Sequence, residues 1–175
     1  RVGCGGGGGR WWGGGPAARL IGWGAGRMEG QTYRCPTIAA MKHLSPKHAC
    51  TWLQDEQARR AAAGLDGPLF IDARMEIESL YVRRPLGAEN IPWCEYPDLA
   101  RFAAAVEAEA GTKERPVLLI CCSGKRTLDA GLALEATGFR ALTDVLHGFE
   151  GDLNNAFKRS SLNGWRYDQL PWDQM

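Results

Sequence analysis

The sequence predicts an α/β fold, with a central and mostly parallel sheet that carries helices on both faces. The first observation is that short apolar runs, which are typical of buried strands, alternate along the chain with stretches that have helical signals. The second is the composition, because 45% hydrophobic and 23% charged residues are typical of a globular protein. A length of 175 residues fits one domain with an appendage.

The first 44 residues differ in composition from the rest of the chain. Residues 3–26 are dominated by glycine, contain no acidic residue and show neither helical nor strand periodicity. Such a stretch buries too little surface to offset the entropy that it loses on ordering. We therefore expect residues 1–44 to be a disordered, glycine-rich segment and residues 45–175 to be the folded domain.

The helices are marked by caps and by glycines. Ser45 followed by Pro46 places an N-cap before the first turn of a helix, and Gly64 supplies a stop. A second stretch has apolar residues at helical spacing and ends at Gly111, and a third is closed by Gly138. The predicted helices cover 46–63, 98–110 and 127–137.

Four short apolar runs are predicted to be strands, and the sequence PVLLIC is the clearest of them. They cover 68–72, 88–92, 116–121 and 142–147. Strands that alternate with helices favour parallel pairing. In such sheets, ligands gather beyond the carboxyl ends of the strands, so the loop after residue 120 is a candidate site.

The charge and the hydropathy exclude several kinds of partner. The formal net charge is +1, so the balance indicates neither nucleic acid nor an anionic membrane. No apolar stretch approaches ~18 residues, the length that crosses a bilayer. We therefore expect no nucleic-acid partner and no membrane partner.

The six cysteines, at positions 4, 35, 50, 94, 121 and 122, have no regular spacing and include no C-x-x-C pair. In a chain of this length, that pattern does not indicate a disulfide framework. It favours free thiols in a reducing compartment, and we expect the protein to be cytoplasmic. Adjacent Cys121 and Cys122 are poorly placed to hold one zinc ion together, so we expect no metal and no cofactor.

The loop that follows the clearest strand combines two thiols with two cations, Lys125 and Arg126. Its far end leads into a helix, where unpaired backbone N–H groups and the helix dipole favour an anion. Cys121 in this setting is expected to ionise readily, and a thiolate is a nucleophile. The alternative is that the cysteine is only a small buried hydrophobe at a strand end.

Residues 121–126 (CCSGKR) resemble the active-site loop of the rhodanese sulfurtransferase family, which is commonly Cys-Arg-Ser-Gly-x-Arg. Upstream, residues 71–74 (IDAR), with Glu76 and Glu78 after them, are similar to the family's Asp-x-Arg…Glu segment. Residues 86–92 (LGAENIP) resemble its Gly-Ala-x-x-Ile-Pro segment. The resemblance implies a rhodanese-like sheet covered by helices on both faces.

The resemblance covers residues 45–175, since VLHGFEGDLN and NGWRYDQLPW are similar to the C-terminal part of bacterial single-domain rhodaneses. Two departures stand out. Cys122 occupies a position where many relatives have arginine, and the segment RRPLGA lacks the histidine that usually precedes Gly-Ala in the family. The first departure removes one cation from the loop and adds a thiol.

The resemblance also implies a chemistry. Cys121 would attack the outer sulfur of thiosulfate, release sulfite and carry a persulfide, which passes its sulfur to cyanide or a thiol. Asp72 and Arg74 would form a supporting hydrogen-bonded network. The remaining active-site loop would stabilise the anionic sulfur through its amides and cations: Cys122, Ser123, Gly124, Lys125 and Arg126.

Other functions fit parts of the pattern. A phosphatase on the same fold needs five residues between the cysteine and the arginine, whereas four separate Cys121 from Arg126. That smaller loop favours sulfur over phosphate. A phosphate-binding loop is rejected, because Leu119 stands where its first glycine belongs. A rhodanese-like docking module without activity and a persulfide carrier that serves a thiol protein remain alternatives.

Overall fold

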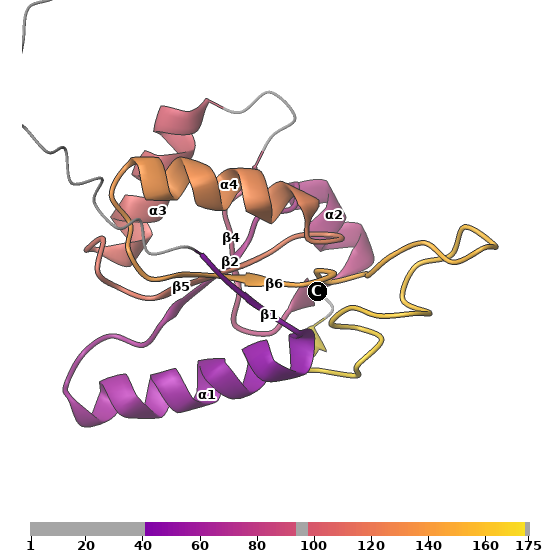
Figure 1. Ribbon diagram of the computed structural model, residues 1–175, viewed down its shortest axis with the longest axis horizontal. Coiled ribbons are helices and arrows are strands. Elements are labelled where there is room, and N and C mark those ends of the chain that lie inside the picture. The colour runs from indigo at the N-terminus through magenta and orange to yellow at the C-terminus, as the bar shows by residue number, and fades with distance from the viewer. Residues whose placement is uncertain (1–40, 94–97, 174–175) are drawn as a thin grey trace, which may run out of the picture. The chain divides into compact units, whose positions relative to one another are not determined.

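The computed structural model describes residues 41–93 and 98–173, and in this part of the chain helices lie on both sides of a central sheet (Figure 1). The sheet has five parallel strands in the order β1-β6-β5-β2-β4. In that order the strands are Lys42–Leu44, Leu142–Val145, Val117–Ile120, Leu69–Asp72 and Glu89–Asn90. The predicted α/β fold with a parallel sheet is therefore confirmed.

Four helices are present among the described residues: α1 (Pro46–Ala62), α2 (Glu76–Val82), α3 (Leu99–Ala110) and α4 (Lys125–Ala136). The three predicted helices match α1, α3 and α4 within two residues at each end, because local signals set their ends. Ser45 caps α1 as expected, since its hydroxyl accepts the N–H of His48 at 3.4 Å. Within the described chain, no helix combines the length and apolar character needed to cross a membrane.

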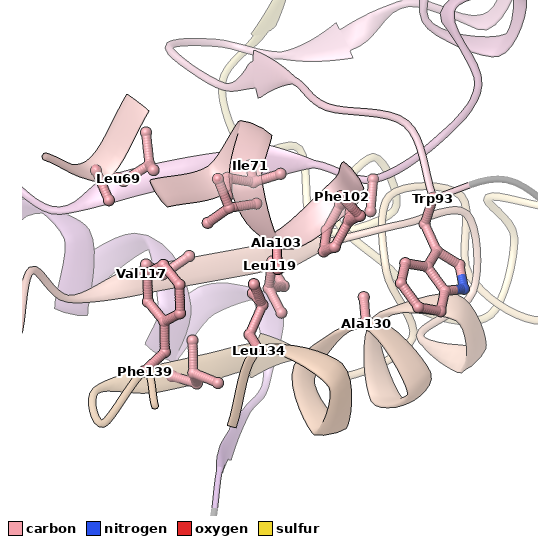
Figure 2. Close-up of a cluster of buried hydrophobic side chains, with 14 of the residues drawn as sticks. Leu69, Ile71, Trp93, Phe102, Ala103, Val117, Leu119, Ala130, Leu134 and Phe139 are labelled. Atoms are coloured by element: carbon pink, nitrogen blue, oxygen red, sulfur yellow. The ribbon is translucent and has the colours of Figure 1, made fainter. Parts of the chain in front are cut away.

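The core lies on both faces of the sheet, around the neighbouring strands β5 and β2. On one face, Leu69, Ile71 and Leu119 pack against α3 and α4 (Figure 2). On the other face, Phe70 and Leu118 pack against α1 and the C-terminal segment, which is the stretch after β6 (residues 146–173). All four residues of β5 are 0% exposed, which explains why this strand is an unbroken apolar run. Each such side chain contributes about 1.5–3 kcal/mol through burial.

The prediction that residues 1–44 are disordered is wrong for residues 42–44. These residues form β1 at the edge of the sheet, where His43 lies opposite Asp144 and its Nδ1 is 3.3 Å from Asp144 Oδ2. This strand has only three residues and is largely exposed, so it lacks the apolar run by which buried strands are recognised in a sequence. Residues 1–40 lie outside the described residues.

The C-terminal segment is tied to the core by Trp165. Its indole ring is 2% exposed and packs on Phe70 with 5.5 Å between ring centroids. Its Nε1 donates to the carbonyl of Pro171 at 2.8 Å. After this turn, β7 (Trp172–Asp173) pairs antiparallel with β3 (Arg84–Pro85). The sequence predicted neither of these two-residue strands.

Trp165→Ala is expected to lower the free energy of unfolding by about 3–5 kcal/mol, because it leaves a cavity beneath the C-terminal segment. Trp172→Ala serves as the control, since Trp172 is 37% exposed and its loss should cost about 1 kcal/mol. Urea unfolding of both variants measures the difference. Equal losses would contradict the anchoring role of Trp165.

Candidate active site

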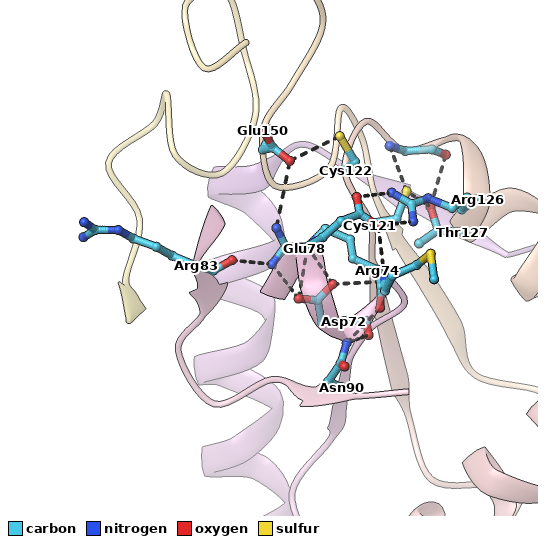
Figure 3. A network of polar contacts seen from close by, with 12 residues as sticks. Asp72, Arg74, Glu78, Arg83, Asn90, Cys121, Cys122, Arg126, Thr127 and Glu150 are labelled. Carbon is cyan, nitrogen blue, oxygen red and sulfur yellow. Dashed lines mark hydrogen bonds and ion pairs between the residues drawn. The ribbon is translucent and has the colours of Figure 1, made fainter. Parts of the chain in front are cut away.

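Cys121 is the first residue after β5, at the carboxyl end of the parallel sheet, and it is 1% exposed. Its Sγ accepts the backbone N–H of Gly124 at 3.2 Å and lies 3.7 Å from Thr127 Oγ1 (Figure 3). Gly124 precedes α4, so this N–H belongs to the positive end of the helix dipole. The sulfur of Cys121 therefore lies at the N-terminus of a helix, beyond the carboxyl end of its strand, which is the position that the sequence predicted.

Thr127 was not among the predicted site residues. Its hydroxyl donates to the carbonyl of Gly124 at 3.1 Å, and its side chain is completely buried beside the Cys121 sulfur. The only sequence signal was a threonine in the first turn of a helix, a position where a hydroxyl reaches back toward the preceding loop.

The loop is held from the far side by the turn that follows β6. Phe149 N–H donates to the carbonyl of Cys121 at 2.7 Å, and Glu150 N–H donates to that of Cys122 at 2.9 Å. Gly148 makes this approach possible, because a Cβ there would lie 2.3 Å from the Cys121 carbonyl oxygen. Its φ of 60° also favours glycine. The backbone of the loop is therefore fixed by residues almost thirty positions away.

Arg126 forms two hydrogen bonds to Glu78 in α2, with Nη1–Oε2 at 2.6 Å and Nη2–Oε1 at 2.7 Å. Glu78 also accepts the N–H of Met75 at 3.0 Å. The pKa of the Glu78 carboxyl is lowered, first by its hydrogen bonds from Arg126. The guanidinium thus binds a carboxylate of the protein and acts on the sulfur of Cys121 only through its charge. The sequence had indicated no such partner.

Asp72 and Arg74 form a hydrogen-bonded network, as the resemblance implied. Both residues are fully buried, and Arg74 donates from Nε to Oδ1 at 2.9 Å and from Nη2 to Oδ2 at 2.6 Å. The same Nη2 donates to the carbonyl of Arg83 at 2.6 Å, and the guanidinium stacks on the Phe149 ring at 4.3 Å. Asn90 closes the network by donating to both of their backbone carbonyls.

No protein-family model and no curated protein matches this sequence. Among solved structures, the chain is similar to Rv0390 from M. tuberculosis, at 28% identity and a TM-score of 0.62, over 77% of this chain and 98% of that chain. It is also similar to the rhodanese-like domain of an Anabaena protein, at 14% identity and a TM-score of 0.50, over 76% of this chain and 79% of that one. The chain has a rhodanese-like fold.

A further structural neighbour is the polysulfide-sulfur transferase from Wolinella succinogenes, at 19% identity and a TM-score of 0.51. The alignment covers 79% of this chain and 82% of that chain. The rhodanese-like fold that the resemblance implied is therefore confirmed, and the loop of residues 121–126 lies where the ends of its strands converge.

Cys122 points away from the Cys121 sulfur and toward the C-terminal segment of the rhodanese-like domain (Figure 3). Its Sγ donates to Glu150 Oε1 at 3.4 Å. Burial and the neighbouring carboxylate raise the pKa of the Cys122 thiol to about 11. Cys122 is therefore a thiol at neutral pH. Glu150 was not predicted as a site residue, although it lies in the stretch VLHGFEGDLN that resembles bacterial single-domain rhodaneses.

The other predicted loop residues lie around this pair. Ser123 is half-buried in the loop, and Lys125 is exposed at the first residue of α4. Glu78, Cys122 and Glu150 bring one potential ligand atom each to within 4.8 Å of one another. Glu78 is already paired with Arg126, so we do not propose a metal site there.

Cys122 is expected to resist alkylation at neutral pH. With a pKa of about 11, only about one molecule in a thousand carries the Cys122 thiolate at pH 8. In a Cys121→Ser variant, alkylation of Cys122 by iodoacetamide should therefore accelerate about tenfold per pH unit up to about pH 10. Glu150→Gln should move this profile to lower pH, and an ordinary thiol profile in both proteins would contradict the burial argument.

Proposed function

We propose that this protein is a sulfurtransferase that moves sulfane sulfur from thiosulfate or a related donor to a thiophilic acceptor. The sulfur travels as a persulfide on Cys121. The observation that carries the proposal is the hydrogen bond of 3.2 Å from Gly124 N–H to Cys121 Sγ, at the start of α4. A buried thiol that was merely packed would not need an N–H at a helix N-terminus directed at its sulfur.

The reaction has two displacements. The Cys121 thiolate attacks the outer sulfur of thiosulfate, the S–S bond of the donor breaks, and sulfite leaves with the electron pair. An acceptor such as cyanide or a thiolate then attacks the outer sulfur of the persulfide, and Cys121 departs as the thiolate. Negative charge lies near the loop in every state, so the helix N-terminus stabilises the whole cycle. The proposed cycle uses neither a metal nor a cofactor.

A docking module without activity shares the fold, but it has no need for a stabilised sulfur. The contacts of Cys121 with Gly124 and Thr127 therefore favour the enzyme. A persulfide carrier that delivers sulfur to a thiol protein uses the same first displacement. It differs from the enzyme only in the acceptor, and both functions belong in the cytoplasm, where thiols stay reduced.

The proposal is tested by incubating the protein with thiosulfate and cyanide and measuring thiocyanate. Turnover above the uncatalysed rate is the expected result. A persulfide that forms from thiosulfate but passes only to a protein thiol would favour the carrier. If Cys121 never acquires sulfur from any sulfane donor, the proposed function is wrong.

A further inference from the structure

One buried carboxyl group near the active-site loop has no role in the cycle described above. Asp144 lies in β6, opposite His43 of β1 and Leu119 of β5, and it is 1% exposed. Its Oδ2 is 3.3 Å from Nδ1 of His43, but its Oδ1 has no hydrogen-bond partner within the described chain. A buried carboxylate oxygen without a partner is costly, so a proton on Oδ1 is favoured.

Thr127 links Asp144 to the sulfur of Cys121. Its Oγ1 is 3.7 Å from Cys121 Sγ, and either atom of that pair can donate (Figure 3). The same hydroxyl also acts on the Asp144 carboxyl, because it lowers the pKa of that group. Both side chains are buried, so the path from the sulfur to the carboxyl lies inside the protein.

The surroundings of Asp144 make it a stronger base than an ordinary carboxylate. Burial raises the pKa of the Asp144 carboxyl, and the interactions with Thr127 and His43 offset only part of that rise. His43 is the titratable group that faces Asp144 from β1, and a positive charge on it favours the ionised carboxylate. From β5 the neighbour is the apolar Leu119, and from α4 it is Thr127. A raised pKa brings the carboxylate closer to the range in which it exchanges protons at neutral pH.

The thiol of Cys121 needs a base that it does not touch. Cys121 is 1% exposed, and the polar contacts of its sulfur among the described residues are the N–H of Gly124 and the hydroxyl of Thr127. A backbone N–H only donates. A hydroxyl can take a proton if it passes its own proton onward at the same time. Within the protein, the proton of Cys121 can therefore leave through Thr127.

Resting on the proposed function, we propose that Asp144 accepts the proton of Cys121 through the hydroxyl of Thr127, and that this relay sets the pH at which the nucleophile becomes reactive. Asp144 does not touch the reacting sulfur, so it is a positioning residue that acts through Thr127. After the transfer its carboxyl is neutral and adds no repulsion toward the thiosulfate dianion.

The relay conserves protons and electrons. The S–H bond of Cys121 breaks, and its electron pair stays on the sulfur. The proton bonds to Thr127 Oγ1 while the original hydroxyl proton passes to Asp144 Oδ1. The products are a thiolate, an intact hydroxyl and a neutral carboxyl, and nothing is oxidised or reduced. One negative charge moves from Asp144 to Cys121, and none is added.

The pH dependence of Cys121 alkylation tests the relay without relying on sulfur transfer. In a Cys122→Ser background the loop holds one thiol, and its labelling by iodoacetamide is followed by mass on the loop peptide. Asp144→Asn should lower the rate at pH 7 by about tenfold, because an amide cannot accept the proton. At about pH 10, where hydroxide removes the proton, the rate should return to within about twofold of the parent. A merely structural defect would lower the rate at every pH.

Further variants in the same background locate the path. Thr127→Val lacks the hydroxyl and should shift the profile as Asp144→Asn does. The double variant should shift it no further than either single one, because both interrupt one path. Thr127→Ser keeps a hydroxyl and should keep the parent profile. Asp152→Asn is the matched control, since Asp152 is also hydrogen-bonded to a histidine, at 3.0 Å, but is exposed, and its profile should be unchanged.

The outcomes separate the relay from the proposed function. An unchanged profile in Asp144→Asn or Thr127→Val, or a rate lowered equally at every pH, would overturn the relay. Loading of Cys121 by thiosulfate in the wild type would then still support the sulfurtransferase. A shifted profile in a protein that takes no sulfur from any sulfane donor would support the relay and overturn the proposed function.

Discussion

Cys121→Ser is expected to reduce sulfur transfer by about a thousandfold or more, because a serine hydroxyl cannot carry the sulfane sulfur. The fold should survive, since serine is close in size to cysteine and the Gly124 N–H can still donate to its oxygen. Thiocyanate formation measures the activity, and urea unfolding measures the stability.

Cys122→Ser is the matched control from the same loop. Its thiol donates to Glu150 rather than lying beside Thr127, and a hydroxyl can make the same hydrogen bond. We expect this variant to keep turnover within about threefold of the wild type. Loss of turnover in Cys122→Ser with retention in Cys121→Ser would reverse the assignment of the two thiols.

Asp72→Asn is expected to lower the free energy of unfolding by about 3–5 kcal/mol. The substitution keeps the shape of the side chain, but it removes the carboxylate that is hydrogen-bonded to the buried guanidinium of Arg74 and leaves only Glu150, at 4.0 Å, as a counter-charge. The cost comes from the poorly compensated charge of this buried guanidinium. Urea unfolding measures the loss.

Two further variants test this cause. Adding Arg74→Met to Asp72→Asn should recover part of the loss, because it removes the buried charge. Glu107→Gln breaks an exposed ion pair with Lys113 and should change stability by less than about 1 kcal/mol. If Asp72→Asn were as mild as Glu107→Gln, the buried pair would not be essential to the fold.

Local signals were enough to predict the parts of the fold that are continuous in sequence. The cap at Ser45 and the glycines after α3 and α4 marked the helices, and β2 and β5 were visible as buried apolar runs. The edge strand β1 was missed because it is short, polar and held by its pairing with β6. Helix α2 was missed because, among its residues, only Ser79 is buried.

The candidate site was predictable only as far as one loop. Residues 121–126 carried the motif, so the position of Cys121 at the end of β5 followed from the sequence. The hydrogen-bond partners of Arg126 and Cys122 could not be predicted from the sequence. Glu78 lies 48 residues from Arg126, and Glu150 lies 28 residues from Cys122. The turn at Gly148 and the position of α2 bring them to the loop, and no local pattern encodes either.

The location of the sulfur adduct tests the central claim most directly. The protein is incubated with thiosulfate, alkylated and digested, and the peptide that contains both loop cysteines is fragmented in the mass spectrometer. One extra sulfur atom on Cys121, with Cys122 unmodified by sulfur, is the predicted result. An extra sulfur on Cys122 alone, or on neither cysteine, would contradict the proposed role of Cys121.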